Sequence, residues 1–442
     1  MKRNFKSFVL ISIFLFAAGI LASAETYTWT GSVNGQFTEP GNWKDSLNST
    51  PTWTSPLPAA TYKILDTSLR TPYLPNDVTL AAGTTIIEVG TAGTLASLKL
   101  QEKSFRNTLP KVIVGNKGTL ELSGTPAQLI LLRNGPINLQ PDSTVWYYGG
   151  YDNNIFPGPY QNLIVTGNIK AESLTVEKTT VIGNNNPVTI TAATQTYKGA
   201  VTVQKDVTFD AETSVTFTAA ANVNAGTRNL SFTGGGAVSM QGVTAGTVSA
   251  AGASSLTVNG AVTLSGDLKA KNLTVNTATV TAAKIEVSQA ATVRTAATIA
   301  APTQTYSGAV TVNADTTFNA SSNLTFGADG TVGGTGSIIV PANGTVGIQK
   351  KINLTGGTSK FEQTGTGIIT IGGNASSITA ATQIYTGAVT LNTNTTFSAA
   401  MALTFEQAIT SPTSPKKNVD FNLSSSSGQI KTDSIFAHDI TV

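Results

Sequence analysis

A single histidine, His438, limits the catalytic chemistry that this chain of 442 residues can support. A Ser–His–Asp triad needs an imidazole as its general base, and a histidine-ligated metal needs an imidazole donor. Both would depend on His438, close to the end of the sequence. Its neighbour Asp439 would point to the opposite face of a strand. We therefore expect His438 to be an exposed strand residue without a catalytic role.

Acidic pairs are the second candidate, because enzymes that cleave polysaccharides use carboxylates, often with calcium. Asp206 and Asp210 are the nearest to such a pair. Two related segments hold other turn formers at these positions, Asp315 with Asn319 and Asn394 with Ser398. We therefore expect the acids to shape turns and the protein not to be an enzyme. A polysaccharide lyase or hydrolase is kept as the alternative function.

Metal and cofactor chemistry has little support in the sequence. The chain has no cysteine, which excludes thiolate ligands and disulfides. The glycine-rich segments 234–236 and 333–336 lack the following helix pattern and the Lys-Ser/Thr pair of a phosphate-binding loop. We expect no cofactor and no metal.

Six of the aromatic residues before position 150 could stack on sugar rings. They are Trp29, Trp43, Trp53, Trp146, Tyr147 and Tyr148. The same rings could instead cap a repetitive structure, whose first turn would otherwise expose its core and unpaired strand edges. The cap is favoured because buried rings supply a large apolar area, and sugar stacking is kept as the candidate binding chemistry.

The elements that position these residues follow from a 23-residue pattern that occurs three times. It begins at Gln195, Gln304 and Gln383, reads Gln-x-Tyr-x-Gly-Ala-Val-Thr, and continues to two Thr-Phe pairs. An isoleucine precedes each glutamine by five residues. An internal repeat indicates one structural unit stacked on itself. The separations of 109 and 79 residues fit a solenoid with loop insertions better than a propeller with blades of even size.

Alternation within the unit predicts an all-β fold. Tyr197, Val201 and Val203 would share one face of a strand, with Thr202 on the other. Three short strands in one unit predict one turn of a right-handed parallel β-helix with an aromatic-rich N-terminal cap. Six phenylalanines of the repeats should then be buried, and the threonines should lie outside: Phe209, Phe217, Phe318, Phe326, Phe397 and Phe405.

The first 24 residues have the pattern of a secretory signal peptide. Three basic residues precede the apolar run 8–21, and Ala22-Ser23-Ala24 provides a cleavage pattern before Glu25. No later segment is long and apolar enough for a transmembrane helix. We expect the protein to be exported, to the extracellular space or the outer cell surface.

Loss of the signal peptide also changes the charge of the chain. The whole sequence has 27 Lys and Arg against 24 Asp and Glu, and the signal contains three of the basic residues. The mature chain is therefore formally neutral. This balance gives no support for nucleic acid or anionic lipid as a partner.

Composition divides the chain into four segments. We expect a signal peptide at 1–24, a cap and first coils at 25–145, a repetitive β-helix at 146–410, and a Pro/Ser-containing insertion with a last partial coil at 411–442. The sequence stops within a strand-like stretch, and an open coil end presents unpaired backbone groups. We therefore expect further coils, a partner subunit or an anchoring domain beyond Val442.

Three stretches resemble bacterial surface proteins. Tyr27-Thr-Trp-Thr-Gly-Ser-Val-Asn-Gly-Gln-Phe with Pro40-Gly-Asn-Trp43 resembles the opening of large β-helix passengers, although Phe37 stands where a second tryptophan is usual. The glutamine-containing repeat and Tyr160-Gln-Asn-Leu-Ile-Val-Thr-Gly are similar to segments of filamentous-haemagglutinin-like and autotransporter-type adhesins. The resemblance implies a secreted or surface-displayed adhesin or structural segment that contacts a host or bacterial surface protein or glycan. It implies no catalytic residues.

Overall fold

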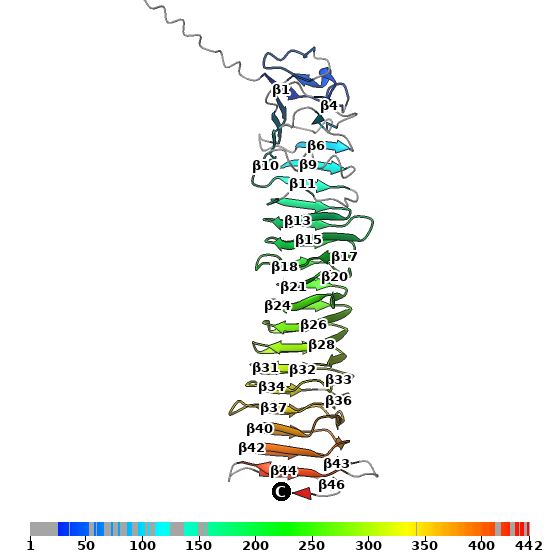
Figure 1. The fold of residues 1–442 in the computed structure, drawn as a ribbon, viewed down its shortest axis with the longest axis vertical. Coiled ribbons are helices and arrows are strands. Elements are labelled where there is room, and N and C mark those ends of the chain that lie inside the picture. Colours follow the sequence, from blue (N-terminus) through cyan, green and yellow to red (C-terminus); the bar gives the residue numbers. More distant parts are fainter. Residues whose placement is uncertain are drawn as a thin grey trace, which may run out of the picture.

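In the computed structural model, stacked strands form an elongated rod with the N-terminal region at one end and the last strands at the other (Figure 1). Residues 158–341 and 343–411 are described without a gap. The other described residues are 25–34, 36–52, 57–58, 60–65, 72–73, 78–79, 86–90, 96–101, 105–106, 111–123, 137–148, 155, 417–424, 429–432, 434–436 and 440–441. The predicted signal peptide lies outside the described residues.

The described part of the chain is all-β apart from one short 3₁₀ helix, η1 (Pro40–Asn42). It forms a parallel β-solenoid of about 14 turns. The all-β solenoid predicted from the repeats is therefore confirmed. Within the described residues, no helix has the length and apolar character needed to cross a membrane.

The N-terminal end carries a separate small sheet around an aromatic cluster. Its strands are parallel except for the antiparallel pair β1–β2. In spatial order they are β10 (Ile137–Leu139), β8 (Lys111–Val114), β5 (Ile86–Val89), β3 (Thr61–Ile64), β1 (Thr26–Trp29) and β2 (Trp43–Lys44). A two-stranded sheet pairs β4 (Val78–Thr79) with β7 (Phe105–Arg106).

From residue 162 onward, each solenoid turn contributes a strand to each of three parallel sheets, which we call face 1, face 2 and face 3, and face 1 begins earlier, at residue 96. Face 1 is formed by β6 (Ala96–Gln101), β9 (Gly118–Ser123), β11 (Thr144–Tyr147), β12 (Asn162–Val165), β14 (Thr180–Ile182), β16 (Val201–Val203), β19 (Val223–Asn224), β22 (Val243–Ala245), β25 (Val262–Leu264), β27 (Thr279–Thr281), β29 (Ala297–Ala300), β32 (Thr316–Asn319), β35 (Ile338–Val340), β38 (Lys360–Gln363) and β45 (Gln429–Thr432). Six long strands bend across a corner and belong to two faces: β13 (Ile169–Val176), β15 (Val188–Tyr197), β26 (Asp267–Val275) and β28 (Lys284–Val293) to faces 2 and 3, and β40 (Ser377–Tyr385) and β42 (Thr395–Phe405) to faces 3 and 1.

The other strands belong to face 2 or face 3. Face 2 contains β17 (Val207–Asp210), β20 (Leu230–Thr233), β23 (Val248–Ala250), β30 (Thr303–Tyr306), β33 (Asn323–Phe326), β36 (Thr345–Ile348), β39 (Ile369–Ile371), β41 (Val389–Leu391), β43 (Ile409–Thr410) and β46 (Ile435–Phe436). Face 3 contains β18 (Ser214–Phe217), β21 (Gly235–Met240), β24 (Ala253–Val258), β31 (Val310–Val312), β34 (Val332–Gly334), β37 (Ile352–Leu354), β44 (Val419–Leu423) and β47 (Ile440–Thr441).

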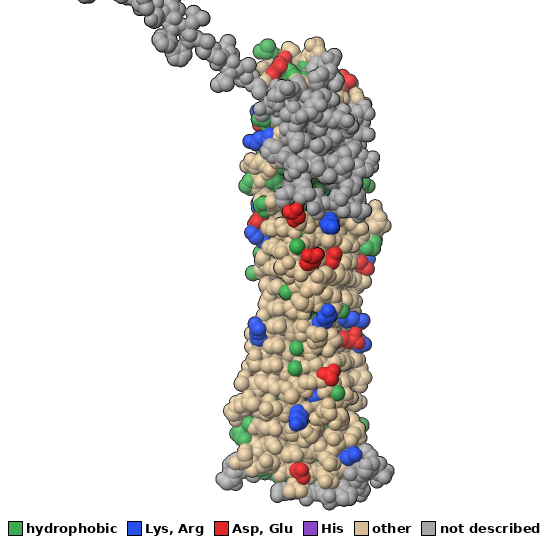
Figure 2. Space-filling model, in the orientation of Figure 1, with side chains coloured by type: hydrophobic (Ala, Val, Ile, Leu, Met, Phe, Trp, Pro, Cys, Tyr) green, Lys and Arg blue, Asp and Glu red, His purple; other side chains and the backbone are tan. Residues whose placement is uncertain are grey.

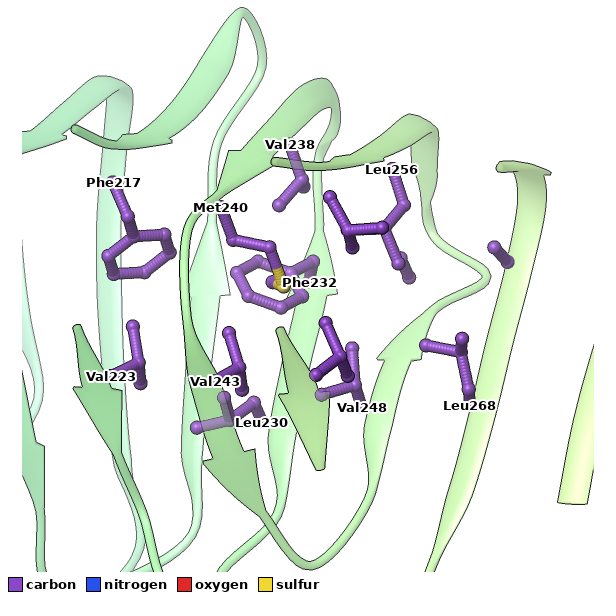
Figure 3. Close-up of a cluster of buried hydrophobic side chains, with 14 of the residues drawn as sticks. Phe217, Val223, Leu230, Phe232, Val238, Met240, Val243, Val248, Leu256 and Leu268 are labelled. Atoms are coloured by element: carbon purple, nitrogen blue, oxygen red, sulfur yellow. The ribbon is translucent and has the colours of Figure 1, made fainter. Parts of the chain in front are cut away.

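The interior is filled by apolar side chains that stack from turn to turn, as Figure 3 shows around Phe232 and Met240. All six phenylalanines predicted to be buried are buried, each at most 1% exposed. Their rings also stack on neighbours: Tyr385 and Phe405 lie 4.6 Å apart at 3°. Alternation of apolar and polar residues therefore assigned the two sides of these strands correctly.

The three copies of the repeat do not lie above one another. Gln195 is on face 3, Gln304 on face 2 and Gln383 on face 1. Each separation covers a whole number of turns plus two further strands, which moves the unit to another face. The expectation that the unit stacks directly on itself is therefore wrong.

The number of residues per turn varies, which explains why the three copies of the repeat lie on different faces of the rod. Leu256 pairs with Leu273, 17 residues later, whereas Leu403 pairs with Ile430, 27 residues later. The pairing also continues from β9 through β11 to β12, across the composition change near residue 145.

Candidate functional site

The repeated glutamine and tyrosine form a buried hydrogen-bonded corner. Gln304 Nε2 donates to the carbonyl of Ile299, five residues earlier, at 2.9 Å, and to that of Asn319 in the next turn at 3.0 Å. The Tyr306 hydroxyl donates to Gln304 Oε1 at 3.0 Å. The same bonds occur around Gln195 and Gln383. These residues satisfy backbone carbonyls where the chain turns a corner, and they are fully buried.

The repeated glycine has an equally structural role. A Cβ atom at Gly308 would lie 1.3 Å from the carbonyl oxygen of Gln289 in the preceding turn. At Gly199 and Gly387 the corresponding distances to a carbonyl oxygen are 1.8 and 1.9 Å. Only glycine allows the two turns to approach this closely.

The acidic pair also serves the corners, as the sequence predicts. Asp206 Oδ1 accepts a hydrogen bond of 2.9 Å from the backbone N–H of Asn229 in the next turn. Asp315 and Asn394 accept the equivalent bonds from the next turn at 2.9 and 3.0 Å. At the second position of the pair, the Asp210 carbonyl accepts from Gln195. In the described parts of the chain, no group of three or more His, Asp or Glu side chains could hold a metal ion.

Three of the candidate sugar-stacking rings point into the protein. Trp43 is fully buried, packs edge-on against Trp29 at 5.1 Å, and donates through Nε1 to the Phe37 carbonyl at 2.8 Å. Tyr147 is also buried, with its hydroxyl 3.0 Å from that of Tyr160. The burial of Trp29, Trp43 and Tyr147 agrees with the interpretation favoured from the sequence, and it leaves neither face of these rings open to a sugar.

The other candidate residues divide into two groups. Trp146 is half-buried and Tyr148 is 55% exposed, with ring centroids 5.8 Å apart at 84°. These two keep sugar stacking as a prediction. Trp53 and His438, with its neighbour Asp439, lie outside the described residues.

A row of hydroxyl groups runs along the outside of face 3. Its members occupy aligned positions of consecutive turns and are partly exposed: Thr196, Thr216, Ser239, Thr257, Thr274, Thr292 and Thr311. Neighbours in such a row are roughly 4.8 Å apart. The same row then continues through Gly333, Asn353, Thr379, Ser398 and Asn422.

The strand segments that carry this hydroxyl row contain no charged residue. The face 3 segments of all strands from β15 to β42 contain no Lys, Arg, Asp or Glu, and each of these residues is described. Charged side chains are scattered over the surface visible in Figure 2. On face 2, Lys269 pairs with Glu286 at 3.6 Å. The sequence predicts outward threonines. Their alignment could not be predicted, because the number of residues in a turn varies along the chain.

Towards the C-terminal end the row opens into a shallow groove with a volume of about 230 Å³. It extends over four consecutive turns, at the corner between faces 3 and 1. Its lining consists of hydroxyl, amide, methyl and backbone groups: Leu354, Thr355, Gly356, Gly357, Thr379, Ala380, Ala381, Ser398, Ala399, Ala400, Asn422 and Ser424. No sequence motif marks this groove.

One fully buried lysine lies at a corner of face 2. Lys350 Nζ donates to the carbonyls of Tyr306 and Ser307, each at 3.1 Å, and to that of Gly308. Burial lowers the pKa of Lys350 to about 8. The ammonium thus satisfies three backbone carbonyls at a corner two turns away, which is a structural role.

Comparisons with protein-family models, curated proteins and solved structures give no match to this chain. The geometry therefore defines the class of protein, a parallel β-solenoid. The resemblance to haemagglutinin-like and autotransporter-type adhesins rests on the sequence motifs alone.

Proposed function

We propose that this protein is an exported adhesin or surface-structural rod that attaches through many weak contacts along one side. The uncharged hydroxyl row of face 3 is the observation that carries the proposal. Contacts repeated along a rigid rod add in free energy without each being strong, because after the first contact the others form within one complex.

The arrangement of the repeats indicates that the repeated residues stabilise the fold and that other residues, on the surface, contact a partner. Glutamine, tyrosine, glycine and phenylalanine of the repeat are used inside the rod or between its turns. The three copies also lie on three different faces. A partner on one side of the rod cannot contact all three copies, whereas it can follow the hydroxyl row.

A carbohydrate-active enzyme is the alternative function. Glycoside hydrolysis uses two carboxylates on either side of the scissile bond. The groove at the end of face 3 is lined by uncharged groups. That lining favours binding over bond cleavage at this position, so we place attachment first.

The proposal can be tested with the full chain after signal removal, coupled to beads and presented to bacterial cells, animal cells, matrix proteins and glycans. Attachment should increase with the density of protein on the bead, because the contacts are multivalent. Release of shortened saccharides from a polysaccharide substrate, with no attachment to any surface, would support the enzyme instead.

A further inference from the structure

We propose that the groove at the end of face 3 binds a segment of a neutral polysaccharide whose chain runs along the hydroxyl row. This rests on the proposed function and names the ligand class. The occupant is inferred from four properties of the groove: its chemistry, its position on a sheet face, its size, and its ordered wall.

The chemistry of the lining selects a hydroxyl-rich, uncharged ligand. Thr379, Ser398 and Asn422 stand side by side in one row and can both donate and accept hydrogen bonds. The small side chains of Ala381 and Ala400 leave room beside them. A charged ligand would lose hydration without gaining an ionic partner among these residues.

The position of the groove argues against an extended peptide. Peptides that add to a sheet pair with the free backbone groups of an edge strand. The groove instead lies on the surface of β40 and β42, which are already paired with each other and with β37, β38, β44 and β45. Recognition must therefore use side chains, as it does for sugars.

The size of the groove fits part of a longer chain. Four turns span roughly 14 Å at 4.8 Å per strand. The volume of about 230 Å³ is below the roughly 300–1,000 Å³ of a pocket that encloses a whole small molecule. A short stretch of a polysaccharide would occupy it, and the rest would continue along Thr311 and the preceding hydroxyl groups.

The wall formed by the Gly356–Gly357 turn is held in place before any ligand arrives. Ser359 is buried, and its hydroxyl lies 2.7 Å from the Gly356 carbonyl and 3.2 Å from that of Leu354. A wall that is already ordered reduces the entropy lost on binding.

Two variants test the groove. Ser398→Glu introduces a charge into its floor, and Thr404→Glu is the matched control on the same strand, outward on face 1. Gly357→Trp fills the groove, and a Cβ there meets nothing within 4 Å, so this variant should fold. Retained folding is checked by hydrogen exchange of the buried strands.

The full mature chain is measured against immobilised short neutral oligosaccharides, with sulfated and sialylated ones as the charged set. We expect neutral binding, a loss of at least about tenfold in Ser398→Glu and Gly357→Trp, and no comparable loss in Thr404→Glu. Preference for the charged set, or unchanged neutral binding in both groove variants, would overturn the groove assignment.

Cell attachment separates this inference from the proposed function. If the two groove variants attach to cells as the wild type does, the groove assignment fails while the adhesin proposal stands. If the wild-type chain attaches to no cell or matrix surface, the adhesin proposal itself fails.

Discussion

At the scale of single residues, the repeat is explained by hydrogen bonds that the backbone cannot make at the corners. Gln304 is the clearest case, because its amide satisfies carbonyls of two turns and its oxygen accepts from Tyr306. Gln304→Leu should destabilise this corner by roughly 1–3 kcal/mol, since buried carbonyls lose their donor. Hydrogen exchange of the flanking strands would measure it, and unchanged protection would contradict the role given to the glutamine.

Lys350 makes stability depend on pH in a defined direction. Its pKa is about 8 in the folded chain, below its ordinary value of 10.5. Between these values the unfolded chain holds more protons than the folded one, so the free energy of unfolding should rise with pH. Below about pH 8, Lys350 is charged in the folded chain, and the cost of burying this charge lowers the free energy of unfolding by its full amount.

Lys350→Met is the control for this pH effect. The difference in urea unfolding between wild type and variant should shift in favour of the wild type from pH 8 to about 9.5. Burial raises the pKa of Tyr197, Tyr306 and Tyr385 in the folded chain, but wild type and variant contain the same tyrosines, so the effect of their ionisation cancels in this difference. A difference that does not change with pH would show that Lys350 does not titrate there.

At the scale of strands and turns, two glycines give opposite expectations. Gly308→Ala places a Cβ against the carbonyl of the preceding turn and should destabilise strongly, because the backbone must move. Gly357→Ala meets open space and should be neutral or stabilising by about 0.4–1 kcal/mol. Thermal unfolding of both variants tests the pair, and similar midpoints would contradict the spacing of turns described above.

The buried side chains that stack from turn to turn lead us to expect that a core substitution destabilises mainly the turns around it. Phe318 is fully buried and packs edge-on against Phe326 at 5.5 Å. Phe318→Ala should cost roughly 3–5 kcal/mol. Because each turn contacts only its neighbours, protection should fall mainly in adjacent turns. Uniform loss of protection along the whole rod would show that the solenoid unfolds as one unit.

At the scale of the whole molecule, the sequence predicted what depends on local pattern. Alternation in segments such as Val201–Val203 identified strands and their buried side, and the turn-forming residues at Asp206 located a corner. Which residues pair between neighbouring turns could not be predicted from the sequence, because turn lengths differ and the register is set by pairing between distant residues. The hydroxyl row and the groove depend on that register, so neither could be read from the sequence.

The neutral face leads to a last prediction, on salt. Electrostatic attraction weakens as the Debye length falls from about 30 Å at 0.01 M salt to about 3 Å at 1 M. The face 3 strand segments from β15 to β42 contain no charged residue, so attachment through them should change by less than about twofold over this range of sodium chloride. Lys284→Gln, which breaks the Lys284–Glu286 ion pair on face 2, should also leave attachment unchanged. A steep decrease with salt that disappears in Lys284→Gln would instead place the contact surface on the charged groups of face 2.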